Sequence, residues 1–336
     1  MTISTKYHSE DLSKYSFLIT GGAGFIGSNL VDYLIQHRAG KIRILDNLST
    51  GSIDNIKEFI NLPQVEFIEG DIRSFDTCKS AMAGIDYVSH QAALGSVPRS
   101  INDPLTSNDV NVTGFLNILT AAKETGVKRM VYAASSSTYG DSNILPKQEE
   151  IIGMPLSPYA VTKYVNELYG HVFSLVYDFH SIGLRYFNVF GPKQNPKGPY
   201  AAVIPLFIAK ISSNQQPIIN GKGDNSRDFT FVSNVIQANI KAMLKVDIPR
   251  HTVLNIACGS QTSLLELIDT VNKELGTDVK PGFHEPRQGD VKHSLADISK
   301  ARKEIGYDPQ VSFREGVSKT VAYFKSNLAK ENQPDE

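Results

Sequence analysis

Two side chains near the middle of the chain have the types and spacing of an acid–base pair. Tyr159 and Lys163 stand four residues apart in the stretch PYAVTK, so on a helix they share one face. A nearby ammonium favours the phenolate, and lowering the phenol pKa from about 10 by about 3 units would require about 4 kcal/mol. Ser137, upstream in SSSTYG, could orient the hydroxyl group that reacts. The alternative is a tyrosine and a lysine on a solvated helix face.

A glycine-rich turn near the start of the chain has the features of a dinucleotide site. It follows the apolar run 17–19 and precedes a helical pattern that begins at Phe25. Gly21 would permit the tight turn, Gly24 would let the backbone approach a diphosphate, and Gly27 would let the helix pack on the strand. The helix start would direct unpaired N–H groups at the phosphates. The spacing differs from G-x-G-x-x-G, and no G-K-[ST] of a triphosphate-binding loop follows.

Acidic residues follow the next two predicted strands, 41–45 and 65–68. Asp46 lies where an acid binds the ribose of a dinucleotide and repels a 2′-phosphate, which favours NAD over NADP. Asp71 could reach the adenine amino group. Turn formation is the alternative for Asp46, and helix capping would explain Asp71 equally well. The residues predicted to bind the cofactor are Gly21, Gly24, Phe25, Ile26, Gly27, Asp46, Asn47, Ser49, Thr50, Gly51, Asp71, Ile72, Gln91, Ala92, Ala93, Tyr159 and Lys163.

Strands and helices alternate through the first 190 residues. Further strands are predicted at 86–93, 129–134 and 181–187, with a helix at 158–177; His90 is expected to be a packing residue. This alternation predicts an α/β fold with a Rossmann-type doubly wound parallel sheet. Pro, Gly and Asn become frequent past Pro192, which predicts a smaller lobe over the carboxyl edge of the sheet. The expected organisation is a polar arm over 1–16, an NAD-binding domain over 17–191 to which later segments return, and a mainly substrate-binding lobe over 192–336.

Composition narrows the possible partners. The chain has 336 residues and a formal net charge of −1, so nothing in the charge balance indicates a nucleic-acid or anionic-membrane partner. The N-terminus has no apolar run of a signal peptide, and no stretch approaches the length of a membrane span. Cys78 and Cys258 lack metal-ligand spacing and are expected to be buried thiols. We therefore expect a cytoplasmic protein without a metal site.

Several motifs resemble the extended short-chain dehydrogenase/reductase family. They are TGGAGFIG, DNLSTG, SSSTYG and YAVTK, followed downstream by RYFNVFGP, RDFTFV and PRQGD. The resemblance runs from about residue 15 to residue 324 and implies NAD and a nucleotide-sugar substrate. It also implies that Asn188, Arg227 and Arg287 hold the sugar diphosphate, for which paired guanidinium hydrogen bonds are suited. Ion pairs of Arg227 with Asp228 and of Arg287 with Asp290 are the alternatives.

The resemblance also bears on the reaction. Sugar 4,6-dehydratases of the family carry an Asp-Glu pair where this chain has Thr138 and Tyr139, so we do not expect dehydration. The stretch around SSSTYGDSNILPK is most similar to UDP-N-acetylglucosamine 4-epimerases of bacterial polysaccharide pathways. At the position of Ser294, a bulky Tyr largely confines relatives to non-acetylated hexoses, whereas Ser leaves room for an acetamido group. The substrate-binding residues implied are Gly95, Ser96, Ser136, Ser137, Asn188, Gln194, Val203, Asn220, Arg227, Arg287, Asp290 and Ser294.

The main hypothesis is NAD-dependent C4 epimerisation of UDP-N-acetylglucosamine, and possibly of UDP-glucose, through a 4-keto sugar. Tyr159 would remove the 4-hydroxyl proton while the C4 hydride moves to NAD, which would remain bound through each cycle. An epimerase of UDP-hexuronic acids or a UDP-glucuronate decarboxylase is an alternative, because Lys193, where many relatives have Arg, could suit a carboxylate. A non-enzymatic NAD-sensing module is another alternative. A hydrolase has no G-x-S-x-G motif to support it.

The family commonly dimerises through a four-helix bundle, which here would use helices at about 106–126 and 158–179. Apolar residues recur at helical spacing along the second of these helices, as expected for such an interface. The same stripe could instead pack on the chain's own sheet. Its members are Val161, Val165, Leu168, Val172 and Leu175.

Overall fold

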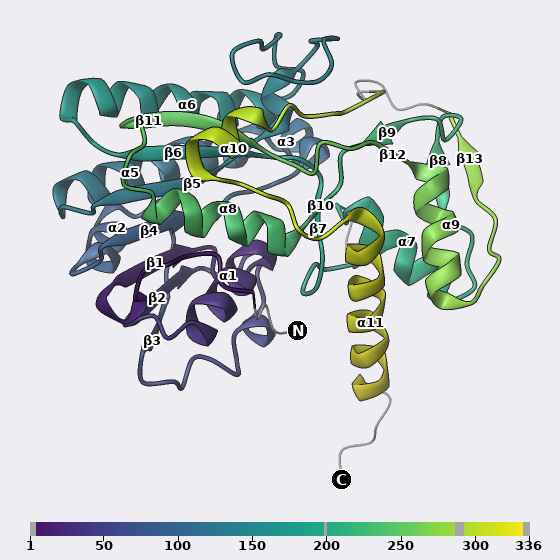
Figure 1. Cartoon of the computed structure of the whole chain (residues 1–336), viewed down its shortest axis with the longest axis horizontal. Helices are drawn as coiled ribbons and strands as arrows, with labels where there is room; N and C mark the ends of the chain where they lie inside the picture. Colours follow the sequence, from purple (N-terminus) through teal and green to yellow (C-terminus); the bar gives the residue numbers. More distant parts are fainter. Residues whose placement is uncertain (1–4, 198–199, 286–291, 332–336) are drawn as a thin grey trace.

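The fold is built on a seven-stranded parallel sheet, seen in Figure 1. The computed structural model describes residues 5–197, 200–285 and 292–331. The strand order is β11-β6-β5-β4-β1-β2-β3. After β3 the chain crosses back and adds β4 on the other side of β1, and ligands bind at such a switch point in folds of this kind. The predicted doubly wound sheet is confirmed. Its strands are β1 (Ser16–Thr20), β2 (Lys41–Asp46), β3 (Val65–Glu69), β4 (Tyr87–His90), β5 (Arg129–Ser135), β6 (Ser181–Tyr186) and β11 (His251–Ile256).

Helices cover both faces of this sheet. Along β1 the side chains alternate between two hydrophobic clusters: Phe17 and Ile19 belong to one and Leu18 to the other, as the period of a strand requires. The first cluster lies under α1 and α8, and the second lies under α2 and α5. The longer helices around the sheet are α1 (Phe25–Gln36), α2 (Phe75–Met82), α5 (Gly114–Glu124), α6 (Pro158–Tyr177) and α8 (Val232–Leu244).

The segment between β4 and α5 is broken into short pieces. They are α3 (Val97–Asn102), α4 (Pro104–Asn108) and a π-helical turn (Asp109–Thr113). Asp103 ends α3 and caps α4, where its side chain accepts a hydrogen bond from Thr106 N at 3.0 Å. These pieces pack on α6, so the loop after β4 is held close to the start of that helix.

The later part of the chain contributes to two regions. The elements α8 and β11 return to the main sheet, whereas α7, α9 and α11 group beside the small strand pair β8–β13 (Figure 1). This group stands next to the carboxyl ends of the strands. The remaining elements of the later part of the chain are β7 (Val189–Phe190), α7 (Val203–Ser212), β8 (Ile218–Asn220), β9 (Ser226–Arg227), β10 (Thr230–Phe231), β12 (Thr262–Ser263), α9 (Leu264–Leu275), β13 (Gly282–His284), α10 (Ser299–Ile305) and α11 (Phe313–Glu331). Of these, α10 packs on β11 and α8.

Two local expectations differ from the structure. The predicted strand 86–93 ends at His90, because the chain beyond it passes against the glycine turn instead of continuing the ladder. The N-terminal arm is not purely a polar surface segment: Tyr7 is buried, its ring stacks on Tyr33 at 5.4 Å, and its N–H donates to the Tyr33 hydroxyl at 2.8 Å. The arm is therefore fastened to α1. No helix in the described ranges combines the length and the apolar character that a membrane crossing needs.

Candidate active site

The glycine turn between β1 and α1 has the geometry of a diphosphate cradle. Gly21 has φ +67°, and a Cβ there would lie 2.7 Å from Ala92 N. A Cβ on Gly27 would lie 2.2 Å from the Gly21 carbonyl oxygen, so α1 can approach β1 only without a side chain there. Gly24 differs, because its Cβ would meet only that carbonyl, at 3.1 Å. Gly24 also caps α1 without a side-chain hydrogen bond, which leaves N–H groups for an anion. The turn therefore fits the dinucleotide predicted for it.

Asp46 holds the loops around this turn. Its Oδ2 accepts a hydrogen bond from Ala23 N at 2.9 Å, and its Oδ1 accepts one from Leu48 N at 2.8 Å. Gly51 packs against Ala23, where a Cβ would come within 2.9 Å of the carbonyl carbon. Burial raises the pKa of the Asp46 carboxyl. The turn-forming role is thus present, and a ribose contact by Asp46 stays a prediction.

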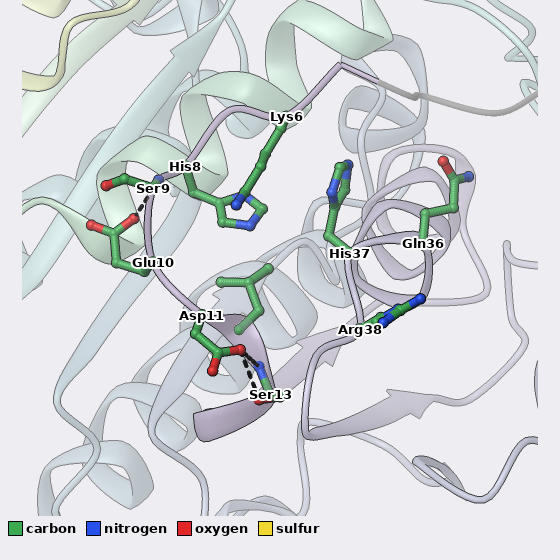
Figure 2. Close-up of a pocket in the computed structure, with 10 residues that line it drawn as sticks. Lys6, His8, Ser9, Glu10, Asp11, Ser13, Gln36, His37 and Arg38 are labelled. Atoms are coloured by element: carbon green, nitrogen blue, oxygen red, sulfur yellow. Dashed lines mark hydrogen bonds between the residues drawn. The ribbon is translucent and has the colours of Figure 1, made fainter.

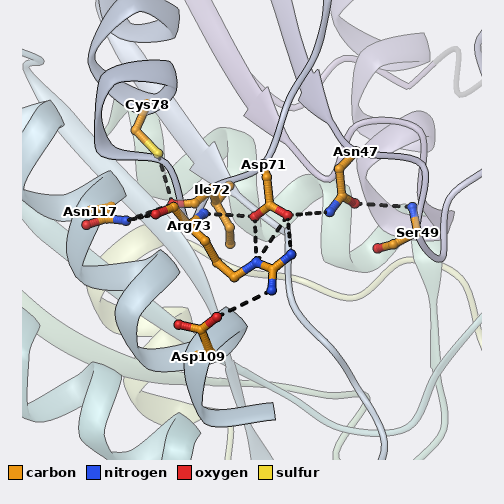
Figure 3. A network of polar contacts seen from close by, with 8 residues as sticks. All are labelled: Asn47, Ser49, Asp71, Ile72, Arg73, Cys78, Asp109 and Asn117. Atoms are coloured by element: carbon orange, nitrogen blue, oxygen red, sulfur yellow. Dashed lines mark hydrogen bonds and ion pairs between the residues drawn. The ribbon is translucent and has the colours of Figure 1, made fainter. Parts of the chain in front are cut away.

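Asp71 and Asn47, both predicted cofactor residues, belong to one polar network (Figure 3). Asn47 Nδ2 donates to Asp71 Oδ2 at 3.0 Å, and Arg73 Nη2 lies 2.7 Å from the same oxygen. Arg73 also reaches Asp109 Oδ2 at 3.3 Å. The Arg73 hydrogen bonds are the main reason why the pKa of Asp71 falls to about 2. The capping alternative for Asp71 is wrong, because Ser74 is the residue that caps α2.

Sequence reasoning did not single out Arg73. Its position two residues after Asp71 was the available signal, because an Asx-type turn brings such a side chain back onto the carboxylate. Arg73 N donates to Asp71 Oδ1 at 2.9 Å, as that turn requires.

Tyr159 and Lys163 lie in the first two turns of α6, which Ser157 caps by accepting a hydrogen bond from Ala160 N at 3.2 Å. Lys163 is only 3% exposed, and its Nζ donates to the Ala133 carbonyl oxygen at 2.8 Å. The alternative of a solvated helix face is therefore wrong.

Without the positive charge of an oxidised nicotinamide, Lys163 alone does not lower the pKa of Tyr159. Burial raises the pKa of Tyr159, an effect that the Ser135 hydroxyl partly offsets. Burial lowers the pKa of Lys163 to about 8. Both shifts follow from the same cause, because a low-dielectric site disfavours the charged form of either group.

The serine turn after β5 faces the start of α6. Ser137 Oγ donates to Ser135 Oγ at 2.8 Å, and Ser135 also caps the 3-10 helix Ser136–Tyr139 by accepting from Ser137 N. Ser135 is thus a residue that sequence reasoning missed, although it opens the same SSS run. Thr138 Oγ1 donates to the Ser135 carbonyl, and the Tyr139 hydroxyl donates to Asn255 Oδ1 at 2.6 Å.

A cavity of about 510 Å³ opens beside this turn. It brings together five of the predicted substrate residues from four separate parts of the chain. They are Ser136, Ser137, Asn188, Arg227 and Ser294. Apolar side chains that were not predicted complete its wall, among them Val97, Ile101, Leu156 and Phe187. Among the described residues, no three His, Cys, Asp or Glu side chains gather so that they could hold a metal ion.

Five other predicted substrate residues do not line this cavity. Ser96 caps α3 and accepts from Arg99 N at 3.2 Å, and Gly95 precedes it. Val203 begins α7, and Asn220 ends β8. Gln194 donates to the Val189 carbonyl at 3.3 Å, while its buried Oε1 has no hydrogen-bond partner among the described residues. That acceptor is available to a ligand. Arg287, Asp290 and their alternative ion pair lie outside the described residues.

Arg227 is held by backbone oxygens on one side. Its Nη1 donates to the carbonyls of Ser226 at 2.9 Å and Lys292 at 3.1 Å. The neighbouring Asp228 carboxylate instead accepts hydrogen bonds from Cys258 N at 2.9 Å and Gly259 N at 3.0 Å. This arrangement counts against the alternative of an Arg227–Asp228 ion pair.

Lys193 lies away from the cavity. Its Nζ donates to the Asn55 carbonyl at 3.0 Å and lies 4.9 Å from the centre of the Phe59 ring. These contacts place it beside the loop that follows β2, so the expectation that Lys193 could meet a substrate carboxylate is wrong. The cysteines differ from each other: Cys78 is buried and Cys258 only half-buried, and both are free thiols.

A second hollow, of about 580 Å³, lies between the N-terminal arm and the end of α1 (Figure 2). Lys6, His8, Glu10, His37 and Arg38 contribute to its wall. Because α1 starts at the carboxyl edge of the sheet, its end lies at the opposite edge. None of the described residues predicted to form the site lines this hollow.

The predicted apolar stripe of α6 is largely exposed. Val161 and Leu168 are each 48% exposed, Val172 is 46% exposed and Leu175 is 71% exposed; Val165 is half-buried. The alternative that this stripe packs on the chain's own sheet is therefore wrong. In Figure 1, α6 runs along the outside of the molecule.

Comparisons with known proteins agree with this geometry. The family model described as GDP-mannose 4,6 dehydratase matches residues 18–320. A putative UDP-glucose 4-epimerase of Methanocaldococcus jannaschii is 39% identical over 312 residues, which are 92% of this chain and 98% of the relative. The solved UDP-N-acetylglucosamine 4-epimerase of Methanobrevibacter ruminantium, in complex with UDP-N-acetylmuramic acid, superposes with a TM-score of 0.88 at 38% identity, covering 93% of this chain and 99% of that one.

A second solved structure, the UDP-glucose 4-epimerase of Thermus thermophilus in complex with NAD, gives a TM-score of 0.82 at 31% identity, covering 92% of this chain and 99% of that one. The match to the family model and the identity to the relatives extend over nearly the whole chain. The chain therefore belongs to the GDP-mannose 4,6-dehydratase family within the extended short-chain dehydrogenases/reductases, as its motifs predicted.

Proposed function

We propose that this chain is an NAD-dependent 4-epimerase of UDP-sugars and that it interconverts UDP-N-acetylglucosamine and UDP-N-acetylgalactosamine. The observation that carries the proposal is that Ser294 lines the same cavity as Ser136 and Ser137. A small side chain at that place leaves volume for a 2-acetamido group. The similarity to solved UDP-sugar 4-epimerases supports the reaction type.

The glycine turn is the proposed binding site of the cofactor. NAD held there supplies a reversible acceptor for the C4 hydride. Gly24 leaves room for a diphosphate, and the uncapped N–H groups at the start of α1 would bind it. Asn47 and Asp71, joined by their hydrogen bond, serve the adenosine end. Because hydride returns to the sugar in each cycle, we propose that the cofactor stays bound and copurifies.

Tyr159 takes the proton of the 4-hydroxyl group and returns it after the 4-keto sugar has turned over. Lys163 would contact the ribose of the nicotinamide, and its ammonium together with the positive charge of the oxidised nicotinamide would favour the phenolate. Ser137 holds the reacting hydroxyl group by a hydrogen bond, with Ser135 fixing the orientation of Ser137. Arg227 and Asn188 bind the diphosphate from the other lobe.

Epimerisation suits this site better than dehydration does. Loss of water needs a general acid and a general base beyond the tyrosine. Thr138 is buried and bonded to the Ser135 carbonyl, while the Tyr139 hydroxyl is bonded to Asn255. Neither residue offers a carboxyl group to the cavity. Because no described residue that lines the cavity carries a carboxyl group, we propose that hydride returns to the 4-keto sugar and that water is not eliminated.

The test is incubation of the purified protein with UDP-N-acetylglucosamine while the sugar H1 and H4 signals are followed by NMR. We expect UDP-N-acetylgalactosamine to accumulate to an equilibrium ratio that is the same from either direction. A parallel incubation with UDP-glucose measures whether the substrate range also includes non-acetylated sugars. The absence of any C4-inverted product from acetylated and plain UDP-hexoses would contradict the proposal.

We also propose a homodimer in which the exposed face of α6 packs with α5 against the same helices of a second copy. The support is the exposed stripe itself. Four large apolar side chains on this one helix are between 46% and 71% exposed, and a contiguous apolar patch of this kind marks an interaction site. A bundle of four helices would bury them.

A further inference from the structure

The wall of the cavity beside the serine turn is assembled from separate parts of the chain. Ser137 and Tyr139 belong to the serine turn, whereas Ser294 lies in the segment before α10. Lys147, from the loop between β5 and α6, also lines the cavity. This loop is bonded to the Ser294 segment, since Lys147 N donates to the Leu295 carbonyl at 2.7 Å. The width of the cavity therefore depends on what joins the serine turn to this bonded pair of segments.

One buried side chain joins all three parts. Asn255, near the end of β11, is 0% exposed and is not one of the residues that line the cavity. Its Oδ1 accepts a hydrogen bond from the Tyr139 hydroxyl at 2.6 Å. Its Nδ2 donates to the carbonyl oxygens of Lys147 at 2.9 Å and Asp297 at 3.0 Å. A single amide group thus bonds the serine turn, the loop and the segment that carries Ser294.

The amide is itself held in place by the sheet. Asn255 N donates to Glu149 Oε1 at 2.8 Å, and Asn255 pairs with Arg185 of β6. The Arg185 guanidinium lies 4.8 Å from the centre of the Tyr139 ring and is fixed by an ion pair with Glu167 at 2.7 Å. Both N–H groups of the Asn255 side chain are used within the protein, so its effect on a substrate must pass through the walls of the cavity.

The chemistry of the three partners requires an amide at this position. The Tyr139 hydroxyl needs an acceptor, whereas the carbonyls of Lys147 and Asp297 need donors. A carboxylate in place of Asn255 would face two carbonyl oxygens, and an apolar side chain would leave all three partners buried without it. The asparagine is therefore matched to the two walls at once.

We propose that Asn255 is a positioning residue that fixes the width of the sugar cavity and thereby its preference for a 2-acetamido group. The inference rests on the proposed 4-epimerase function and adds a residue that touches no substrate. Closely packed, fully bonded side chains keep one arrangement, so the 2-substituent meets a wall that is already in place. Without the amide, the serine turn and the Ser294 segment can move independently, and binding of the acetylated sugar must then order them.

The test is Asn255→Ala, with kcat/KM for UDP-N-acetylglucosamine over that for UDP-glucose measured by NMR. We expect this ratio to fall about tenfold, because the net worth of one or two neutral hydrogen bonds corresponds to a factor of this size. The loss should appear mainly as a higher KM for the acetylated sugar, while the NAD bound per chain stays at the wild-type value. Tyr139→Phe, which removes only the hydroxyl that bonds Asn255, should lower the ratio by a smaller factor and decides the matter if Asn255→Ala does not fold.

The two substitutions should not act independently. In the double variant the ratio should equal that of Asn255→Ala, because Tyr139→Phe removes a hydrogen bond that is already absent. Two factors that simply multiply would indicate unrelated defects and would overturn the inference.

Asn272→Ala is the matched control for the loss of a buried amide. Asn272 is 7% exposed in α9, where its side chain bonds Val279 N and the Val279 carbonyl, each at 3.0 Å, away from the cavity. This variant should be less stable than the wild type but should keep its ratio. A fall of the ratio in Asn272→Ala equal to that in Asn255→Ala would mean that general loosening is the cause, which overturns the inference.

The outcomes separate this inference from the proposed function. A wild type that inverts C4, together with an unchanged ratio in Asn255→Ala and Tyr139→Phe, overturns the inference and leaves the function standing. A wild type that inverts neither sugar overturns the function. The ratio of the dissociation constants of the two UDP-sugars, from titration calorimetry on the same variants, then decides the inference in place of kcat/KM.

Discussion

The Nζ atom of Lys163 lies 6.0 Å from the centre of the Tyr159 ring while it donates a 2.8 Å hydrogen bond to the Ala133 carbonyl oxygen. The lysine is thus tied to the end of β5, one helical turn from the phenol. This arrangement fixes the ammonium at the edge of the sheet where the serine turn begins. It couples the positions of the two side chains that are proposed to carry the chemistry.

Replacing Tyr159 by Phe should abolish C4 inversion, with a fall in kcat of about a thousandfold, because the only change is loss of the proton acceptor. The measurement is the NMR rate with UDP-N-acetylglucosamine. Tyr164→Phe, on the same helix and at a position with no proposed role in the reaction, is the matched control and should keep the wild-type rate. A Tyr159→Phe protein with full biological activity would instead favour an NAD-sensing module.

Alanine substitutions at Gly24 and Gly27 should separate cofactor binding from folding. A Cβ at Gly24 would meet protein only at 3.1 Å, so Gly24→Ala should fold but lose bound NAD. A Cβ at Gly27 would lie 2.2 Å from the Gly21 carbonyl oxygen, so Gly27→Ala should lower the free energy of unfolding by about 2 kcal/mol or more.

Bound NAD is quantified by chromatography of the denatured, purified proteins, and stability is measured by urea unfolding. The wild type should release close to one NAD per chain without added cofactor. A wild type that consumes added NAD in every turnover would count against a resident cofactor. Full NAD retention in Gly24→Ala would show that the diphosphate does not approach this turn.

Ser294→Tyr should narrow the substrate range. A bulky ring in the cavity wall would occupy the volume left for the acetamido group, so the ratio of kcat/KM for UDP-N-acetylglucosamine over UDP-glucose should fall about tenfold or more. Ser294→Ala stays small and should keep this ratio. An equal loss of kcat/KM with both sugars in Ser294→Tyr would mean that this residue does not distinguish the substituents at C2.

Leu175→Glu should dissociate the proposed dimer. The side chain is 71% exposed in the single chain, so the folded monomer tolerates the charge, whereas a buried interface does not. Light scattering after gel filtration should give a mass near 36.9 kDa, that of one chain. Val246→Glu, at a position 81% exposed and outside α6, is the control and should stay dimeric. A monomeric wild type would exclude the bundle.

His90 should make the protein less stable in mild acid. It is 3% exposed, its Nδ1 lies 2.7 Å from Thr20 Oγ1, and burial lowers its pKa to about 3. Between that value and the ordinary pKa of about 6.5, the unfolded chain binds a proton that the folded chain does not, so stability falls as pH falls.

From pH 7 to pH 5 this one group should remove about 2 kcal/mol of the free energy of unfolding. His90→Asn, which cannot titrate in this range, should show a loss smaller by that amount in urea unfolding at the two pH values. His284→Asn, at an exposed position, is the control and should behave like the wild type. An unchanged pH dependence in His90→Asn would contradict the assignment.

Local patterns in the sequence were enough for much of the framework. The helix Pro158–Tyr177 has the predicted bounds, because a capping serine, a proline in the first turn and an apolar period are all local. Gly21 and Gly27 could be assigned from their spacing, since tight turns and close helix packing restrict the residue type at one position. Alternating strands and helices likewise predicted the parallel sheet.

The tertiary structure decided which side chains meet. Lys193 has the right charge for a sugar carboxylate, but its Nζ donates to the Asn55 carbonyl, away from the cavity. Lys147, which was not predicted, lines the cavity instead. The stripe of α6 had a helical period that fits a core or an interface, and only its exposure separated the two. Such outcomes depend on contacts between residues far apart in the chain.

The sequence by itself therefore determined the family, the glycine turn and the Tyr159–Lys163 spacing, because each rests on neighbouring residues and backbone geometry. The tertiary structure alone decided that Ser137, Ser294 and Lys147 share one cavity and that burial raises the pKa of Tyr159. The physical reason is that burial and charge pairing depend on packing between distant segments, and the spacing of residues along a chain does not contain that information.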